Sequence, residues 1–237
     1  MEYYIPFSII ALAAAIHASF QLSISTLTLM SGHALGRKNS QARLVKLLGG
    51  FLFGAICMTT LLFIAAFYAA EFMFFEQGIP PIIWAAVCGI LFGFGVAVWM
   101  FYFRKGRGTI LWIPRGMAQY LNVRSKRTKN TAEAFGLGMS TVVGELLFII
   151  APLIVAVLVT LTLAPMLQIA ALLLYVAVSC STLALVAALV SSGHKISRIQ
   201  RWREDSRRFL QFISGTSLLI LGFYLYVNEV LAIGGVV

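Results

Sequence analysis

Two ionisable side chains lie inside long apolar stretches of this sequence. Glu145 falls within residues 140–152, STVVGELLFIIAP, and His17 begins the segment 17–28, HASFQLSISTLT. A charged group at the centre of a membrane helix costs roughly 2.5 to 3.5 kcal/mol, so it usually faces a cavity or a partner. A carboxylate and an imidazole can bind and release protons, and both can bind cations. We therefore expect both residues to belong to one site.

Helical spacing adds further polar residues to this expected site. Gln21 and Thr28 follow His17 by four and eleven positions, and Thr141 precedes Glu145 by four, so each set shares one helix face. Ser23, Thr26 and Ser140 point at other angles and need not face the same cavity. The sequence leaves open whether a metal ion binds. The expected solute- or ion-binding residues are His17, Gln21, Ser25, Thr28, Thr141 and Glu145.

The helix that carries Glu145 is expected to unwind locally. Pro152 removes one backbone donor, and Gly136, Gly138 and Gly144 loosen the same segment. Freed carbonyl groups could then coordinate a cation. The structural alternative stays open, because a His and a Glu can pair merely to tie two helices together, and hydroxyls often bond back to their own helix.

The composition places these residues in a membrane protein. The 237 residues are 60% hydrophobic and 11% charged, and the mean hydropathy is +0.93, unlike that of a soluble domain. We expect one all-α membrane domain, 1–237, without a cofactor. His17 and Glu145 lie about 12 and about 11 residues into their runs, near the middle of a ~30 Å hydrocarbon core. Six runs predict transmembrane helices: 5–31, 47–70, 81–103, 134–162, 166–192 and 209–233.

The distribution of basic residues predicts the orientation. All 18 Lys and Arg residues lie in the connections between runs one and two, three and four, and five and six. By the positive-inside rule these connections are cytoplasmic and both termini lie outside the cell (plasma or inner) membrane. The net charge of +10 therefore indicates contact with anionic lipid headgroups, and nucleic acid is excluded as a partner.

The basic connection 104–130 divides the chain into two halves of three runs each, 1–103 and 131–237. An odd number of spans per half gives the halves opposite orientations, as in a 3+3 inverted repeat. The centre of the connection, 109–120, mixes aromatic, aliphatic and Arg residues, which favours a segment on the membrane interface.

Three segments resemble the LysE-type exporter superfamily, which also includes the CcdA and DsbD thiol-disulfide carriers and several metal exporters. They are LTLMSGHALGRK at 27–38, LLGGFLFG at 47–54 and RRFLQFISGTSLLILG at 207–222. The resemblance implies a 3+3 fold whose first and fourth spans carry the working residues. The thiol carriers have a cysteine in each of these spans, whereas Cys57, Cys88 and Cys180 lie elsewhere, so dithiol electron transfer is not expected.

We expect a secondary transporter that moves a small solute or cation by alternating access, with protonation of Glu145 and His17 as the coupling event. The alternative is a membrane-embedded scaffold or partner subunit with a structural His-Glu pair. An enzyme is not expected, because the chain has no HExxH, GxSxG or paired aspartates. A homodimer is one possible assembly.

Overall fold

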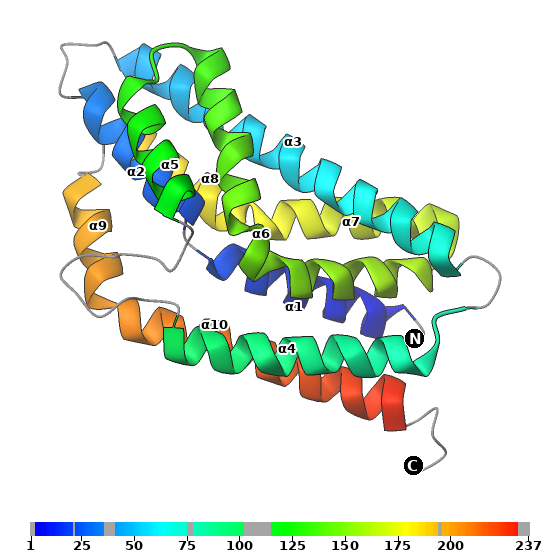
Figure 1. The fold of residues 1–237 in the computed structure, drawn as a ribbon. Helices are drawn as coiled ribbons and strands as arrows, with labels where there is room; N and C mark the ends of the chain where they lie inside the picture. Colours follow the sequence, from blue (N-terminus) through cyan, green and yellow to red (C-terminus); the bar gives the residue numbers. More distant parts are fainter. Residues whose placement is uncertain are drawn as a thin grey trace.

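The computed structural model describes residues 3–20, 22–35, 41–74, 78–101, 115–193 and 196–231. Within these ranges every regular element is a helix, which confirms the all-α prediction (Figure 1). The elements are α1 (Tyr4–Ser19), α2 (Leu22–Leu35), α3 (Gln41–Phe74), α4 (Pro81–Phe101), α5 (Arg115–Arg127), α6 (Thr131–Leu161), α7 (Pro165–Ser179), α8 (Ser181–Ser191), α9 (Ile196–Asp205), α10 (Arg207–Leu225) and the π-helix η1 (Tyr226–Leu231).

Four helical segments are long and apolar enough to cross a membrane: α3, α4, α6 and the continuous segment Arg208–Leu231. Two helix pairs qualify only if each is counted as one bent span. The axes of α1 and α2 differ by 43°, and those of α7 and α8 differ by 45°. The described chain therefore has between four and six candidate spans, which agrees with the membrane character expected from the composition.

The expected unwinding near Glu145 is wrong, because α6 is continuous despite Pro152. This helix lies at the centre of the bundle and packs on α1, α2, α3, α4, α5 and α7. Packing on all sides keeps its helical hydrogen bonding unbroken past the proline, although α6 changes direction midway along its length (Figure 1). The chain breaks instead at Phe20, whose extended backbone separates α1 from α2.

Glycines allow α3 and α6 to approach until their backbones touch. A Cβ atom at Gly54 would overlap the carbonyl oxygen of Phe135, and a Cβ atom at Gly138 would overlap that of Phe51. The contact is reciprocal, because the glycine of each helix leaves space for a backbone carbonyl of the other. Gly138 therefore serves close packing rather than loosening the helix.

A second pair, α4 and α10, runs side by side below the other helices (Figure 1). Gly95 and Gly215 face each other at this crossing. The indole of Trp99 stacks on the ring of Phe212 with centroids 5.9 Å apart, and its N–H donates to the Phe212 carbonyl over 3.2 Å.

The short helices gather at one end of the bundle. α2, α5 and α9 lie at the left in Figure 1, whereas the start of α1 and the end of η1 lie at the right. α5 is not simply a surface segment, because it packs on α2 and α6 and buries Leu121 and Ser125. The basic helices α5 and α9 therefore occupy the end opposite to the start of α1.

Candidate functional site

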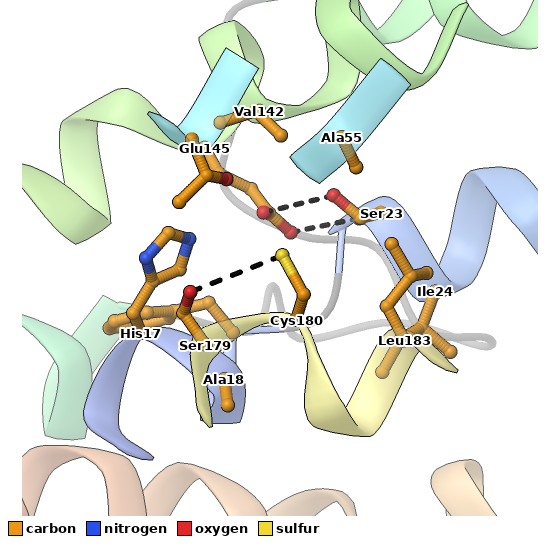
Figure 2. Close-up of a pocket in the computed structure, with 12 residues that line it drawn as sticks. His17, Ala18, Ser23, Ile24, Ala55, Val142, Glu145, Ser179, Cys180 and Leu183 are labelled. Atoms are coloured by element: carbon orange, nitrogen blue, oxygen red, sulfur yellow. Dashed lines mark hydrogen bonds between the residues drawn. The ribbon is translucent and has the colours of Figure 1, made fainter. Parts of the chain in front are cut away.

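The break at Phe20 turns the first residues of α2 toward α6. The first backbone N–H groups of a helix have no partner within the helix, so they need an acceptor from elsewhere. The carboxylate of Glu145 supplies it: Oε1 accepts the backbone N–H of Ser23 over 2.8 Å, and Oε2 accepts the Ser23 hydroxyl over 3.0 Å (Figure 2). Glu145 is buried, with 3% of its surface exposed. A side chain of α6 thus caps α2.

Thr141 belongs to the same cluster, one helical turn before Glu145. Its hydroxyl lies 3.3 Å from the hydroxyl of Ser23 and donates to the Gly138 carbonyl over 2.7 Å. The Ser23 hydroxyl therefore has two acceptors within reach on α6. Thr141 and Glu145 were both expected in the site, whereas Ser23 was not.

The failure to predict Ser23 has a geometric cause. Its angle on a helical wheel was taken from His17, as if residues 5–31 formed one straight helix. The break at Phe20 and the 43° bend change the phase of every residue that follows. Ser23 consequently faces Glu145, which a continuous helix would not allow.

His17 lies on α1 and is held by a residue of α7. Its Nδ1 lies 3.0 Å from the Tyr175 hydroxyl, and the histidine tautomer decides which group donates. Tyr175 is fully buried and also packs on Phe63, with ring centroids 5.1 Å apart. The imidazole is therefore fixed in position, and Tyr175 is a second residue that spacing along the sequence did not reveal.

His17 and Glu145 line one small cavity between the two halves of the chain. Both side chains belong to the lining of this cavity. Among the described residues, the hydrogen-bond partner of His17 is Tyr175 and not Glu145. The volume is about 20 Å³, which is room for about one water molecule. The lining residues are His17, Ala18, Phe20, Ser23, Ile24, Ala55, Thr59, Val142, Glu145, Ser179, Cys180 and Leu183.

The remaining expected residues are not brought to this cavity. Thr28 is buried, but its hydroxyl donates to the carbonyl of Ser25 over 2.9 Å. Ser25 is half-buried, and neither residue is part of the cavity lining. Gln21 lies outside the described residues.

Polar residues at the bend between α7 and α8 also reach the cavity. Ser179 and Cys180 line it, and the Ser179 hydroxyl lies 4.0 Å from the Cys180 sulfur (Figure 2). Thr59 of α3 completes this side, next to the Cys180 thiol. The run Ser-Cys-Ser-Thr at 179–182 is an interruption in an apolar segment and was the signal available in the sequence.

The cavity does not have the ligands of a transition-metal centre. Among the described residues, no group of three or more His, Cys, Asp or Glu side chains is placed to hold one metal ion. The oxygen atoms present come instead from one carboxylate and several hydroxyls, which suit protons, water and hard cations.

The fold and the cavity define an all-helical chain with four to six candidate membrane spans and a buried polar site. No protein-family model matches the chain. No curated protein and no solved structure shows significant similarity to it.

Proposed function

We propose that this chain is a multi-pass secondary transporter of the cell (plasma or inner) membrane, which moves a small solute or cation by alternating access. It needs neither a cofactor nor an enzymatic step. One observation carries the proposal: the buried carboxylate of Glu145 is hydrogen-bonded to the start of α2, next to a cavity between the two halves.

The helix contacts support a 3+3 inverted repeat. An in-plane two-fold would relate the first span, α1/α2, to α6, the second, α3, to α7/α8, and the third, α4, to α10. The packing of α3 on α6 then has its counterpart in α7 on α1, and that of α4 on α6 in α10 on α1. The two helix breaks fall in the first and fifth spans. The fourth span, α6, which the two-fold relates to the first, bends without a break (Figure 1).

The charges support an orientation with both termini outside. The described Lys and Arg residues lie on α5, α9 and the adjoining helix ends, at the end opposite to the start of α1. Anionic headgroups at the cytoplasmic face are the partners that suit this end.

A larger cavity at the other end favours a cationic or neutral solute over an anion. It has a volume of about 500 Å³, within the range of small-molecule sites, and its lining includes Glu71, Glu229, Trp84 and Gln168. The two carboxylates come from α3 and η1 and give this end a negative potential, which concentrates cations.

The coupling step follows from the bond between Glu145 and Ser23. The ionised carboxylate accepts two hydrogen bonds and faces the positive end of the α2 dipole, so it holds α2 against α6. Protonation removes the charge and weakens both bonds. α2 can then tilt about the break at Phe20 and open the cavity from the other side. His17, held by Tyr175, is the second proton-binding group on the wall.

The LysE-type resemblance is part of this proposal. Members of that superfamily are expected to carry their working residues in the first and fourth spans, and the cavity joins α1, α2 and α6. The second candidate function is a membrane-embedded scaffold. It is favoured by the fact that His17 and Glu145 both already have hydrogen-bond partners, as structural residues do.

Proteoliposomes that contain a pH-sensitive dye distinguish the two candidates. A panel of alkali cations, organic amines and neutral amino acids is added outside, and the internal pH is recorded. The transporter predicts a solute-dependent pH change that is lost in Glu145→Gln, while the melting temperature stays within about 3 °C, because the amide can still accept the Ser23 N–H.

The scaffold predicts no pH change with any member of the panel. It also predicts that Glu145→Gln and His17→Gln act only on stability, with a double variant that melts at the temperature expected from the sum of the two single changes. A solute-dependent signal that survives Glu145→Gln would remove Glu145 from the coupling mechanism.

A further inference from the structure

The cavity at Glu145 presents oxygen atoms from four helices. Besides the carboxylate on α6, the hydroxyls of Ser23 on α2, Thr59 on α3 and Ser179 on α7 belong to its lining. All four side chains are buried, with between 2% and 7% of their surface exposed. A polar site with one-water volume and several convergent oxygens can hold a water molecule or a small cation.

The hydroxyl hydrogens of Ser23 and Ser179 are already used in hydrogen bonds within the protein, which leaves their oxygen lone pairs available. Ser23 donates to Glu145 over 3.0 Å, and Ser179 donates to the Val176 carbonyl over 3.2 Å. A hydroxyl whose hydrogen is already used offers only acceptor capacity to a bound species. A cation suits such a set of acceptors better than a water molecule, whose two hydrogens find acceptors but whose own lone pairs find no donor.

Thr59 is the most informative of these residues. It is 2% exposed, belongs to the cavity lining and is hydrogen-bonded to the Cys180 thiol. A hydroxyl that donates to sulfur keeps its oxygen lone pairs as acceptors. A bound cation would use one of these lone pairs.

The backbone adds to the same preference. α1 ends at Ser19, and both Ala18 and Phe20 line the cavity. The Ile16 and His17 carbonyls accept from the Ser19 hydroxyl over 2.6 Å and the Phe20 N–H over 3.2 Å, and the end of the helix carries partial negative charge. The C-terminal ends of broken membrane helices are suited to bind small cations for this reason.

We propose that this cavity binds one monovalent metal cation, of which Na⁺ has the appropriate size. One carboxylate balances one positive charge, whereas Mg²⁺ and Ca²⁺ are bound by more charge and a larger oxygen shell. The small volume favours Na⁺ over the larger K⁺. This inference deepens the proposed function, since the carboxylate that releases a proton is the form that binds the cation.

The test measures the melting temperature and the binding of radioactive Na⁺ by the purified full-length chain. NaCl, KCl, MgCl₂ and choline chloride are compared at constant ionic strength. At about ten times the dissociation constant, Na⁺ should raise the melting temperature by about 3 °C or more relative to choline. Equal melting temperatures in NaCl and choline chloride, or a larger rise with KCl or with Mg²⁺, would overturn the proposal.

Thr59→Val provides the specific variant, because valine keeps the shape and removes only the hydroxyl. Thr60→Val is its matched control: the neighbouring hydroxyl donates to the Ile56 carbonyl over 2.9 Å and is not part of the cavity lining. Thr59→Val should weaken Na⁺ binding by about tenfold, and Thr60→Val should leave it unchanged. Equal Na⁺ affinities in Thr59→Val and Thr60→Val would contradict the assignment. This comparison does not depend on whether a Glu145→Gln variant folds.

This experiment and the flux experiment fail independently. Solute-dependent pH changes without Na⁺ binding would leave the transporter and remove the cation site. Saturable Na⁺ binding without flux for any solute would retain the site and favour the scaffold.

Discussion

The backbone N–H of Ser23 donates to the carboxylate of Glu145 over 2.8 Å, so that an acid on α6 caps the first turn of α2. These residues are 122 positions apart and belong to opposite halves of the chain. A capping bond is usually local. Here it joins the two halves and attaches the start of α2 to the middle of α6.

The first prediction concerns this cap. Ser23→Ala removes the hydroxyl bond to the carboxylate but keeps the backbone bond, and we expect it to lower stability by about 1.5 to 3 kcal/mol. In a Glu145→Gln background the same substitution should cost about half as much, because the bond no longer involves a charge. Thermal unfolding of the four proteins gives the coupling.

Ser31→Ala is the control for this cycle, because Ser31 is a buried hydroxyl on the same helix that donates only to the Leu27 carbonyl. Its effect should be the same in both backgrounds. An identical cost of Ser23→Ala with Glu145 and with Gln at position 145 would mean that the carboxylate charge adds nothing to the bond from the Ser23 hydroxyl.

The second prediction concerns His17 and Tyr175. Tyr175→Phe keeps the ring that packs on Phe63 and removes the hydroxyl 3.0 Å from Nδ1. We expect a loss of about 1 kcal/mol in stability. The ¹⁵N resonance of His17 Nδ1 should shift as its hydrogen bond is lost, which NMR of histidine-labelled protein measures. The chain has 3 histidines, and the resonances of the other two should not move.

The third prediction concerns the crossing of α3 and α6. Gly54→Ala and Gly138→Ala each place a methyl group against a carbonyl oxygen of the other helix, and each should cost about 1 to 3 kcal/mol. Gly49→Ala and Gly136→Ala lie on the same two helices with no atom within 4 Å of the added carbon. These controls should be neutral or slightly stabilising, because alanine favours a helix. Equal melting temperatures for all four variants would show that the crossing tolerates separation.

The fourth prediction concerns orientation. Met166 is 84% exposed near the start of α7, and Tyr120 is 46% exposed on the basic helix α5. In a background without native cysteines, a membrane-impermeant maleimide should label Met166→Cys in intact cells and Tyr120→Cys only after the cells are opened. The reverse pattern would place the basic end outside.

Apolar runs predicted the long helices well. The predicted span 81–103 corresponds to α4, Pro81–Phe101, and 134–162 corresponds to α6, Thr131–Leu161. Both are single helices. α4 begins at Pro81 and α6 follows the capping residue Asn130, and both signals can be recognised in the sequence. Thr141 and Glu145 are one turn apart in the unbroken helix α6, so they lie on the same face as expected.

The bends could not be predicted in the same way. Phe20 and Cys180 lie within short polar interruptions of apolar runs, and such interruptions show where polar side chains lie but not that the helix axis turns. Pro152 marks a potential break, yet α6 is continuous there. Among the described residues assigned by helical phase beyond the bend at Phe20, Ser23 reaches the cavity, whereas Ser25 and Thr28 do not. The sequence does not reveal Tyr175 as the partner of His17, because Tyr175 lies in the apolar helix α7, whose spacing does not show which helix it faces.

The reciprocal glycine contacts have a consequence for how this chain can be made. Gly54 packs on Phe135 and Gly138 on Phe51, so both contacts cross between the halves, as does the contact of Gly95 with Gly215. These contacts join helices that precede residue 102 to helices that follow residue 114. Two separately translated fragments, divided between residues 101 and 115, should insert in opposite orientations and recover one another in the bilayer. The two halves of the chain would then associate through the same helix contacts that two separate subunits use.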